Sequence, residues 1–401
     1  MTTNQIKRFL DSHTYDIRIT KNGRWIDQKC AFDSVCFVAD CIVEYINNGG
    51  KQPFKSVEIW HSAYAEKNVQ HIFGKPNPKK ETTKDEYNKF FRQPMKMLAA
   101  AGVLSEKGKN PILFSVEQME ILEHIALRER NSFEFLCLYI EKTLKDSDLW
   151  YSFEAFFELQ TKEAYLDIKQ KFSEFCFKHT PIKKKDEPNR IFIKVLNHLA
   201  CNQHKKGTES GRLSTNMITF DKIAYNKANW RDVLVGKDKN VARGDYMPAP
   251  SNNDMFDYRV ERAKKYLKKF NDSFNGSRSE VEDQFARGSL ATHIHHIFPI
   301  NQFREIADFI ENLIAITSGQ HLQLAHPNGN TQIVDKEFQY LCLVSKTSSI
   351  QRNLMGSLGD TIIYKYEDFM HVLDTGLSTN YFSGLLDCDF NAVLTGIDKF
   401  Y

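Results

Sequence analysis

Three histidines fall within four positions of the stretch Thr292-His293-Ile294-His295-His296-Ile297-Phe298-Pro299. Adjacent side chains of a β-strand point to opposite faces, so His295 and His296 are not both expected in one core. A neutral imidazole can bind a metal ion, and it can also accept a proton near neutral pH. We therefore predict that one ring binds a metal while the next, on the other face, takes a proton from water. The alternative is a histidine-rich surface hairpin.

The residues that follow this stretch keep a definite spacing. Asn312 lies sixteen positions after His296 (312 − 296), and His321 lies nine positions after Asn312 (321 − 312). An apolar run from Leu313 to Ile316 predicts a second strand between them. This pattern resembles the HNH, or ββα-metal, family of nucleases, in which two strands and a helix carry a general base, an asparagine and the metal ligands.

The resemblance implies a role for four residues of this chain. His295 matches the first metal ligand, and His296 matches the general base, expected to act through Nε2. Asn312 matches the asparagine that holds the long loop, and His321 matches the second ligand on the following helix. Because neutral imidazoles must do this work, activity is expected to fall below about pH 6.5, the ordinary histidine pKa.

A third ligand is expected from one further histidine. Some relatives carry a histidine four residues after the second ligand, and that position is Ala325 in this chain. His326 follows one step later and is our candidate for the role, although it could instead only end the helix before Pro327. The family resemblance implies Mg²⁺ or Mn²⁺ as the cofactor.

Cysteine usage and net charge narrow the class of protein. Many HNH proteins bind a structural zinc through paired Cys-x-x-Cys units, whereas the eight cysteines of this chain are scattered and form no such pair. Unpaired cysteines in apolar settings favour a reducing cytoplasm, and no long apolar run predicts a membrane span or a signal peptide. The net charge over 401 residues is only +3, so any DNA-binding surface must come from local clusters.

The front of the chain predicts three helices and a hairpin. Apolar residues at helical spacing indicate helices near 31–45, 56–72 and 84–101, and two short strands flank a basic turn at 106–110. This order is typical of a winged helix, in which the third helix reads the major groove. Pro94 favours a kink, or a later start of that third helix. The candidate DNA contacts are Arg92, Lys96, Lys107 and Lys109. A winged helix used for protein contacts, or a plain helical domain, is the alternative.

A second basic segment follows a helical region and a charged linker at 180–187. After a helix predicted from Pro188 to Asn202, residues 204–214 combine two glycines with cations and small hydroxyl side chains. Such a loop can bring backbone amides and basic side chains close to phosphates. The candidate contacts are Lys205, Lys206 and Arg212, and a solvated loop is the alternative.

These patterns together predict an α+β, mostly helical, multidomain protein. The expected parts are a winged-helix-like domain (1–120), a helical linker domain (121–182), a basic helix and loop (183–250) and an HNH nuclease domain with a helical tail (251–401). The DNA-reading front end makes the chain resemble a Type II restriction endonuclease that cuts double-stranded DNA. One HNH site cuts one strand, so a duplex break needs a homodimer or two sequential cuts.

Two other functions fit parts of the pattern. A methylation-dependent restriction nuclease would need an aromatic-lined pocket for a flipped base, and no aromatic cluster stands out in the sequence. A winged-helix DNA-binding regulator with a degenerate nuclease domain is the other alternative. The intact set of base, asparagine and ligand argues against the regulator.

Overall fold

Helices dominate the chain, and its strands pair in small antiparallel sheets of two strands each. This confirms the predicted α+β, mostly helical class. A computed structural model describes residues 1–401 except 185, 226–251, 327–333 and 357–360. Contacts divide it into an N-terminal unit, Thr3–Ser251, and a C-terminal unit, Asn252–Tyr401 together with Met1–Thr2. Among the described helices, none combines the length and the apolar character that crossing a membrane requires.

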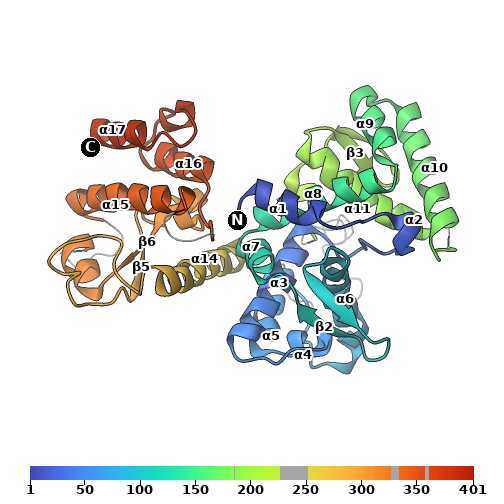
Figure 1. The fold of residues 1–401 in the computed structure, drawn as a ribbon, viewed down its shortest axis with the longest axis horizontal. Coiled ribbons are helices and arrows are strands. Elements are labelled where there is room, and N and C mark those ends of the chain that lie inside the picture. The colour runs from blue at the N-terminus through green and yellow to red at the C-terminus, as the bar shows by residue number, and fades with distance from the viewer. Residues whose placement is uncertain (185, 226–251, 327–333, 357–360) are drawn as a thin grey trace, which may run out of the picture. The chain divides into compact units, whose positions relative to one another are not determined.

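The first part of the N-terminal unit surrounds a central helix, α3. Its elements are α1 (Thr3–Asp11), α2 (Ile17–Thr20), α3 (Phe32–Asn47), α4 (Ser56–Trp60), α5 (Ala63–Phe73), η1 (Glu81–Thr83), α6 (Lys84–Ala100), β1 (Leu104–Lys107) and β2 (Leu113–Val116). Every residue of α3 from Phe32 to Ile42 is buried, because α6 and two later helices, α7 (Met119–Leu127) and α8 (Glu129–Asp146), pack around this helix. The β1–β2 hairpin lies beside α6 (Figure 1).

The predicted order of helix, helix, helix and hairpin is present, with two differences. The second helix is broken into α4 and α5, because Ser62 Oγ accepts a hydrogen bond from Ala65 N and so begins a new helix. Pro94 lies buried inside α6, which continues on both sides of it, so the alternative of a later start was wrong. A bridge between Phe54 and Phe114 adds one extended residue to the edge of the hairpin.

The rest of the N-terminal unit is a helical layer that carries a second hairpin. Its elements are α7 (Met119–Leu127), α8 (Glu129–Asp146), α9 (Trp150–Leu159), α10 (Lys162–His179), α11 (Asp186–Asn202), β3 (Lys206–Glu209), β4 (Arg212–Met217) and α12 (Phe220–Ile223). All three segments that the sequence analysis separated before residue 251 therefore belong to one unit.

The segment 204–214, predicted as a loop, is largely a hairpin, and its glycines therefore have a structural role. Gly211 and Ser210 have positive φ (78° and 50°), as a tight two-residue hairpin turn requires. A Cβ at Gly207 would lie 2.5 Å from Asn197 Oδ1, so this glycine lets β3 pack against α11. Turn geometry and packing therefore explain both glycines without a bound phosphate.

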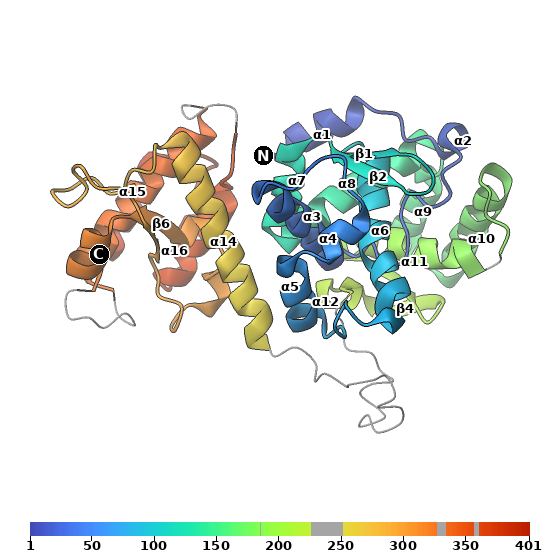
Figure 2. The same cartoon turned by 90° about the horizontal axis from the view of Figure 1, so that it is seen from below.

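The C-terminal unit places a short hairpin between helices. Its elements are α14 (Asn252–Phe274), β5 (His293–His296), η2 (Arg304–Ile306), η3 (Ile310–Asn312), β6 (Leu313–Ile316), the π-helix η4 (Gln320–Ala325), α15 (Lys336–Leu354), α16 (Tyr366–Gly376), η5 (Phe382–Gly384) and α17 (Phe390–Phe400). Helix α14 packs against both strands. Figure 2 shows it beside β6. All four residues of β6 are buried, so both faces of the hairpin are covered.

A buried ion pair ties the hairpin to α15. Lys346 Nζ lies 2.7 Å from Glu280 Oε2, and the two side chains are 0% and 5% exposed. Glu280 Oε1 also accepts a hydrogen bond from Ala315 N in β6, and Lys346 Nζ donates to Tyr364 Oη. The pair thus connects three segments that are far apart in the sequence.

Lys346→Met is expected to lower the free energy of unfolding by about 3–5 kcal/mol, because it leaves the Glu280 carboxylate buried without its cation. Urea unfolding measures the change. Lys268→Met, which breaks the exposed pair of Lys268 with Asp272, is the control and should cost no more than about 1 kcal/mol. Equal losses in the two variants would contradict the role given to Glu280. The double variant Glu280→Gln/Lys346→Met should recover part of the loss.

Candidate functional site

The β5–β6 hairpin fixes the positions of His295 and His296. The strands are antiparallel, with His295 opposite Ile314 and His296 opposite Leu313. Both histidines are buried, at 5% and 7% exposure, and both line the same pocket of about 330 Å³. The expectation that the two rings could not both be buried was wrong, because the hairpin is covered on both faces.

Three histidines converge at this pocket. Nitrogen atoms of His295, His321 and His326 all lie within 4.8 Å of one another. His295 Nε2 and His321 Nδ1 are buried, and neither has a hydrogen-bond partner among the described residues. A buried polar nitrogen without a partner is costly, and a metal ion would satisfy both atoms at once. The residues present therefore fit a metal centre.

The helix that carries His321 explains why His326 reaches the site. In an α-helix the residue one turn after His321 would be Ala325, the position at which the HNH resemblance led us to expect a ligand. Here residues 320–325 form a π-helix, whose hydrogen bonds link residue i to residue i+5. The wider turn contains one more residue, so the side chain that returns to the cluster is His326.

The donor set also bears on the kind of metal. Three imidazole nitrogens suit borderline metals such as Zn²⁺, Ni²⁺ or Fe²⁺, whereas Mg²⁺ prefers oxygen ligands. No carboxylate is among the described residues that line the pocket. Any oxygen ligands would have to come from water or from a bound substrate.

The structure assigns the basic nitrogen of His296. His296 Nε2 lies 3.0 Å from the carbonyl oxygen of Ala307, which can only accept a hydrogen bond. In the neutral ring the proton is therefore on Nε2, and Nδ1 carries the lone pair. The sequence-based expectation that Nε2 would be the base was wrong, because Ala307 lies in the loop and its position could not be read from the strand.

Asn312 closes the loop that contains Ala307. This side chain is fully buried; its Oδ1 accepts from Phe298 N at 2.8 Å, and its Nδ2 donates to the carbonyl oxygens of Phe298 (3.1 Å) and Ile306 (3.2 Å). These bonds join both ends of the segment after His296. Asn312 thereby holds the carbonyl that orients the His296 ring.

Two glutamines near the site were not found by sequence analysis. Gln339 Nε2 donates to Ile297 O at 2.6 Å, directly after His296. Gln320 is fully buried beside His321, and its amide bonds to Thr317 N, to Val281 O and to side chains at 279 and 283. Apart from Thr317, which is three residues from Gln320, these partners lie about forty residues away in the chain, so spacing gave no signal for them.

Burial lowers the pKa of His295, His296 and His321 and so favours their neutral forms. Desolvation, followed by the positive charge of neighbouring histidines, holds the pKa of His295 well below its usual range. Desolvation lowers the pKa of His321 to about 4, with repulsion from His293 the next cause. Desolvation and the charge of Lys264 lower the pKa of His296 to about 4. Neutral rings are the forms that bind metals and accept protons.

The expected pH dependence of the site changes accordingly. If His296 is the general base of a nuclease, as the HNH resemblance implies, it should stay competent well below pH 6.5, because its pKa is about 4 and only protonation removes its lone pair. Single-turnover cleavage at saturating metal should therefore persist at pH 6 and disappear as the pH falls toward 4. A measured midpoint near pH 6.5 would contradict this prediction, and with it the argument that burial lowers the pKa of His296.

The candidate DNA contacts all lie in the N-terminal unit. Arg92, Lys107, Lys109 and Arg212 are exposed, whereas Lys96, Lys205 and Lys206 are partly covered. Lys96 Nζ lies 3.3 Å from Glu106 Oε1, so this lysine would have to leave an ion pair before it could contact a base.

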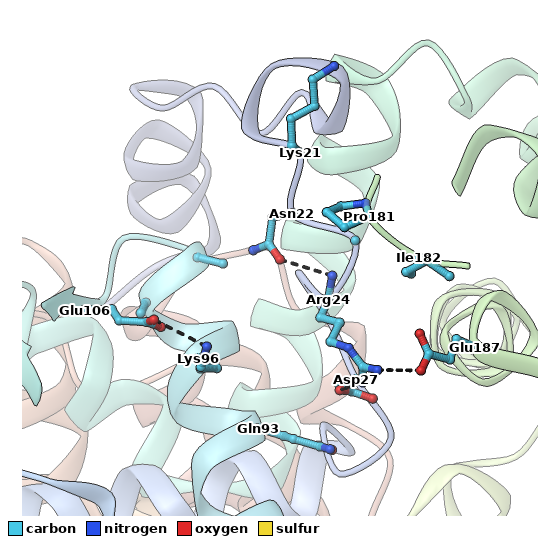
Figure 3. A pocket seen from close by; sticks show the side chains of 13 residues that line it. Lys21, Asn22, Arg24, Asp27, Gln93, Lys96, Glu106, Pro181, Ile182 and Glu187 are labelled. Atoms are coloured by element: carbon cyan, nitrogen blue, oxygen red, sulfur yellow. Dashed lines mark hydrogen bonds and ion pairs between the residues drawn. The ribbon is translucent and has the colours of Figure 1, made fainter. Parts of the chain in front are cut away.

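A pocket of about 730 Å³ lies beside α6 (Figure 3). Arg24 pairs there with Asp27 and with Glu187, each at 2.8 Å, and the Lys96–Glu106 pair lies on its other side. No aromatic side chain is among the described residues that line it. The pocket therefore lacks the stacking surface that a flipped base requires.

Comparison with protein-family models, with curated proteins and with solved structures finds no match for this chain.

Proposed function

We propose that this protein is a metal-dependent endonuclease of the HNH type that hydrolyses phosphodiester bonds in double-stranded DNA. The observation that carries the proposal is the arrangement of the C-terminal unit. Three histidines form a metal-competent cluster, His296 next to them presents an unprotonated nitrogen, and Asn312 braces the intervening loop. The four histidines line one pocket.

The chemistry of the site follows from its nitrogen atoms. His296 Nδ1 accepts a proton from water as the water oxygen bonds to phosphorus, and the bond from phosphorus to the 3′ oxygen breaks. The Ala307 carbonyl holds the ring in the tautomer that this transfer needs, and it stabilises the imidazolium that forms. His295, His321 and His326 would hold the metal, which when bound supplies Lewis-acid stabilisation of the charge on the phosphate. The products would carry 5′-phosphate and 3′-hydroxyl ends.

The metal proposed from the family resemblance is Mg²⁺ or Mn²⁺. Between these two ions the three imidazoles favour Mn²⁺, because Mn²⁺ is a first-row transition metal and such metals bind nitrogen ligands. All eight cysteines are free and seven of them are buried, which agrees with a reducing cytoplasm as the place of action.

We propose further that the front of the chain is a winged helix that selects the DNA sequence, as in a Type II restriction enzyme. Support comes from the order α3, α5, α6 and the β1–β2 hairpin, and from the exposed cations Arg92 on α6 and Lys107 near the hairpin tip. A homodimer, or two sequential cuts, would produce a double-strand break.

Incubation of a plasmid library with the protein and Mg²⁺ or Mn²⁺ tests the proposal. Metal-dependent nicks with a common sequence at the mapped ends are expected. Cuts at random positions would exclude a Type II restriction enzyme. Cleavage of only methylated plasmid would favour the methylation-dependent alternative. An uncut library with either metal, despite binding to DNA, would favour the DNA-binding regulator.

Arg92→Ala should relax the choice of sequence without changing metal binding, because contacts to base edges carry sequence information. Arg212→Ala should weaken binding to all duplexes and lower the salt slope by about one unit, the effect of neutralising one phosphate fewer. Binding of the mapped site and of a scrambled duplex at several salt concentrations compares the two. If Arg92→Ala weakens both duplexes equally, α6 is a clamp and specificity lies elsewhere.

A further inference from the structure

Lys264 occupies a special place among the cations of α14. It lines the pocket that also holds His295, His296 and His321, and it is partly buried there. Lys265, the next residue along the helix, is exposed. Since α14 packs against both strands of the hairpin, the position of Lys264 is fixed by the same core that fixes the histidines.

The ammonium group of Lys264 has no ion-pair partner within the part of the chain that the structure describes. It makes no hydrogen bond or salt bridge there, and the acidic group that influences it is Glu261, three residues earlier on the helix. Lys268, one turn later, shows what a satisfied lysine on this helix looks like, since its Nζ lies 2.6 Å from Asp272 Oδ1. A partly buried cation without a partner is costly unless a ligand supplies the anion.

The charge of the pocket defines that ligand. With a divalent metal on the three histidines, Lys264 would be a further positive charge in a pocket whose described lining contains no carboxylate. The compensating negative charge has to come from outside the protein, from an anion that can contact two cations at once. A phosphodiester fits, because it carries one negative charge shared between two non-bridging oxygens.

We propose that Lys264 binds a non-bridging oxygen of the phosphodiester that is cut, and that it stabilises the negative charge that grows there as water attacks. This inference rests on the proposed nuclease function and adds a phosphate-binding residue that the HNH spacing does not include. Lys264 would donate hydrogen bonds from Nζ and would take no part in proton transfer from the water.

The test compares Lys264→Met with Lys264→Arg and with the exposed control Lys265→Met, all in the full chain. Single-turnover cleavage should fall about 10²-fold in Lys264→Met, the loss typical of one missing charge-stabilising donor. Lys264→Arg should recover a large part of that loss, and Lys265→Met should stay within about twofold of the unchanged protein. In the absence of DNA, Lys264→Met should bind Mn²⁺ as tightly as the unchanged protein does, as measured by calorimetry. If Lys264 only supported the structure of the site, its removal would weaken Mn²⁺ binding as well.

A second readout does not depend on cleavage. In a His296→Ala background, Lys264→Met should lower the salt slope for binding of a short DNA duplex by about one unit, the amount expected for one phosphate contact. Wild-type cleavage and an unchanged slope in Lys264→Met would overturn the inference and leave the proposed function intact. Weaker Mn²⁺ binding would overturn it as well. If the unchanged protein cuts no DNA, the proposed function fails, and the slope alone decides: a reduced slope supports the phosphate contact and an unchanged one overturns it.

Discussion

His296→Ala is expected to reduce single-turnover cleavage by ~10²–10⁴-fold while binding of DNA and of metal changes little, because the ring is the proposed base. Removal of the hydrogen bond to Ala307 should cost about 1 kcal/mol of stability, so the protein should still fold. Cleavage is measured on a labelled duplex at saturating metal, and folding is checked by thermal unfolding.

Two additions separate the loss of a base from a general disturbance. Free imidazole in the buffer should restore part of the activity of His296→Ala, since it can accept the proton that the side chain no longer takes. His371→Ala, an exposed histidine of the same unit, should behave like the unchanged protein. Activity of His296→Ala at the wild-type rate would remove His296 from the mechanism, and His293 would become the next candidate.

Removal of any one cluster histidine is expected to weaken metal binding by more than ~10²-fold, beyond the range typical of groups outside the coordination shell. The variants are His295→Ala, His321→Ala and His326→Ala, compared by titration with Mn²⁺ and with Zn²⁺ in the absence of DNA. Sequence alone led us to expect the smallest effect from His326. Its place within 4.8 Å of the other two now predicts a comparable one.

The same titration tests the donor set. An all-imidazole site should bind Zn²⁺ more tightly than Mn²⁺. Higher Mn²⁺ should restore part of the cleavage in His321→Ala if two ligands still hold the metal. A metal titration that is the same in His321→Ala and in the unchanged protein would exclude this residue from the site.

The elements that sequence predicted well are those whose cause is local. Apolar residues at helical spacing located α3, α6 and α11 closely, because burial of one helix face leaves a periodic trace. The β5–β6 hairpin was likewise expected from its two short apolar and histidine-rich runs. The positions of His295 and His321 near one another follow from a motif confined to a short part of the chain.

What the sequence did not reveal depends on partners that are distant or on backbone detail. The β3–β4 hairpin is mostly polar, so no alternation of apolar side chains indicated it. Gly207 lets this hairpin pack against α11, a contact that carries no sequence signal. The Glu280–Lys346 pair joins residues sixty-six positions apart. The tautomer of His296 depends on the carbonyl of Ala307, a backbone atom that carries no sequence signature.

The π-helix at 320–325 has a consequence for how such sites are searched for and redesigned. The number of residues between two side chains that meet on one face of a helix depends on the helical pitch. A search for a fixed spacing would therefore miss the cluster of His321 and His326, although their nitrogens lie close together. A designer who moved the histidine from position 326 to position 325 would have to delete a residue from the turn as well. The helical pitch and the number of residues between the two histidines have to be changed together. A search that allows the spacing to vary with the pitch would find this arrangement, and a search for one fixed spacing would not.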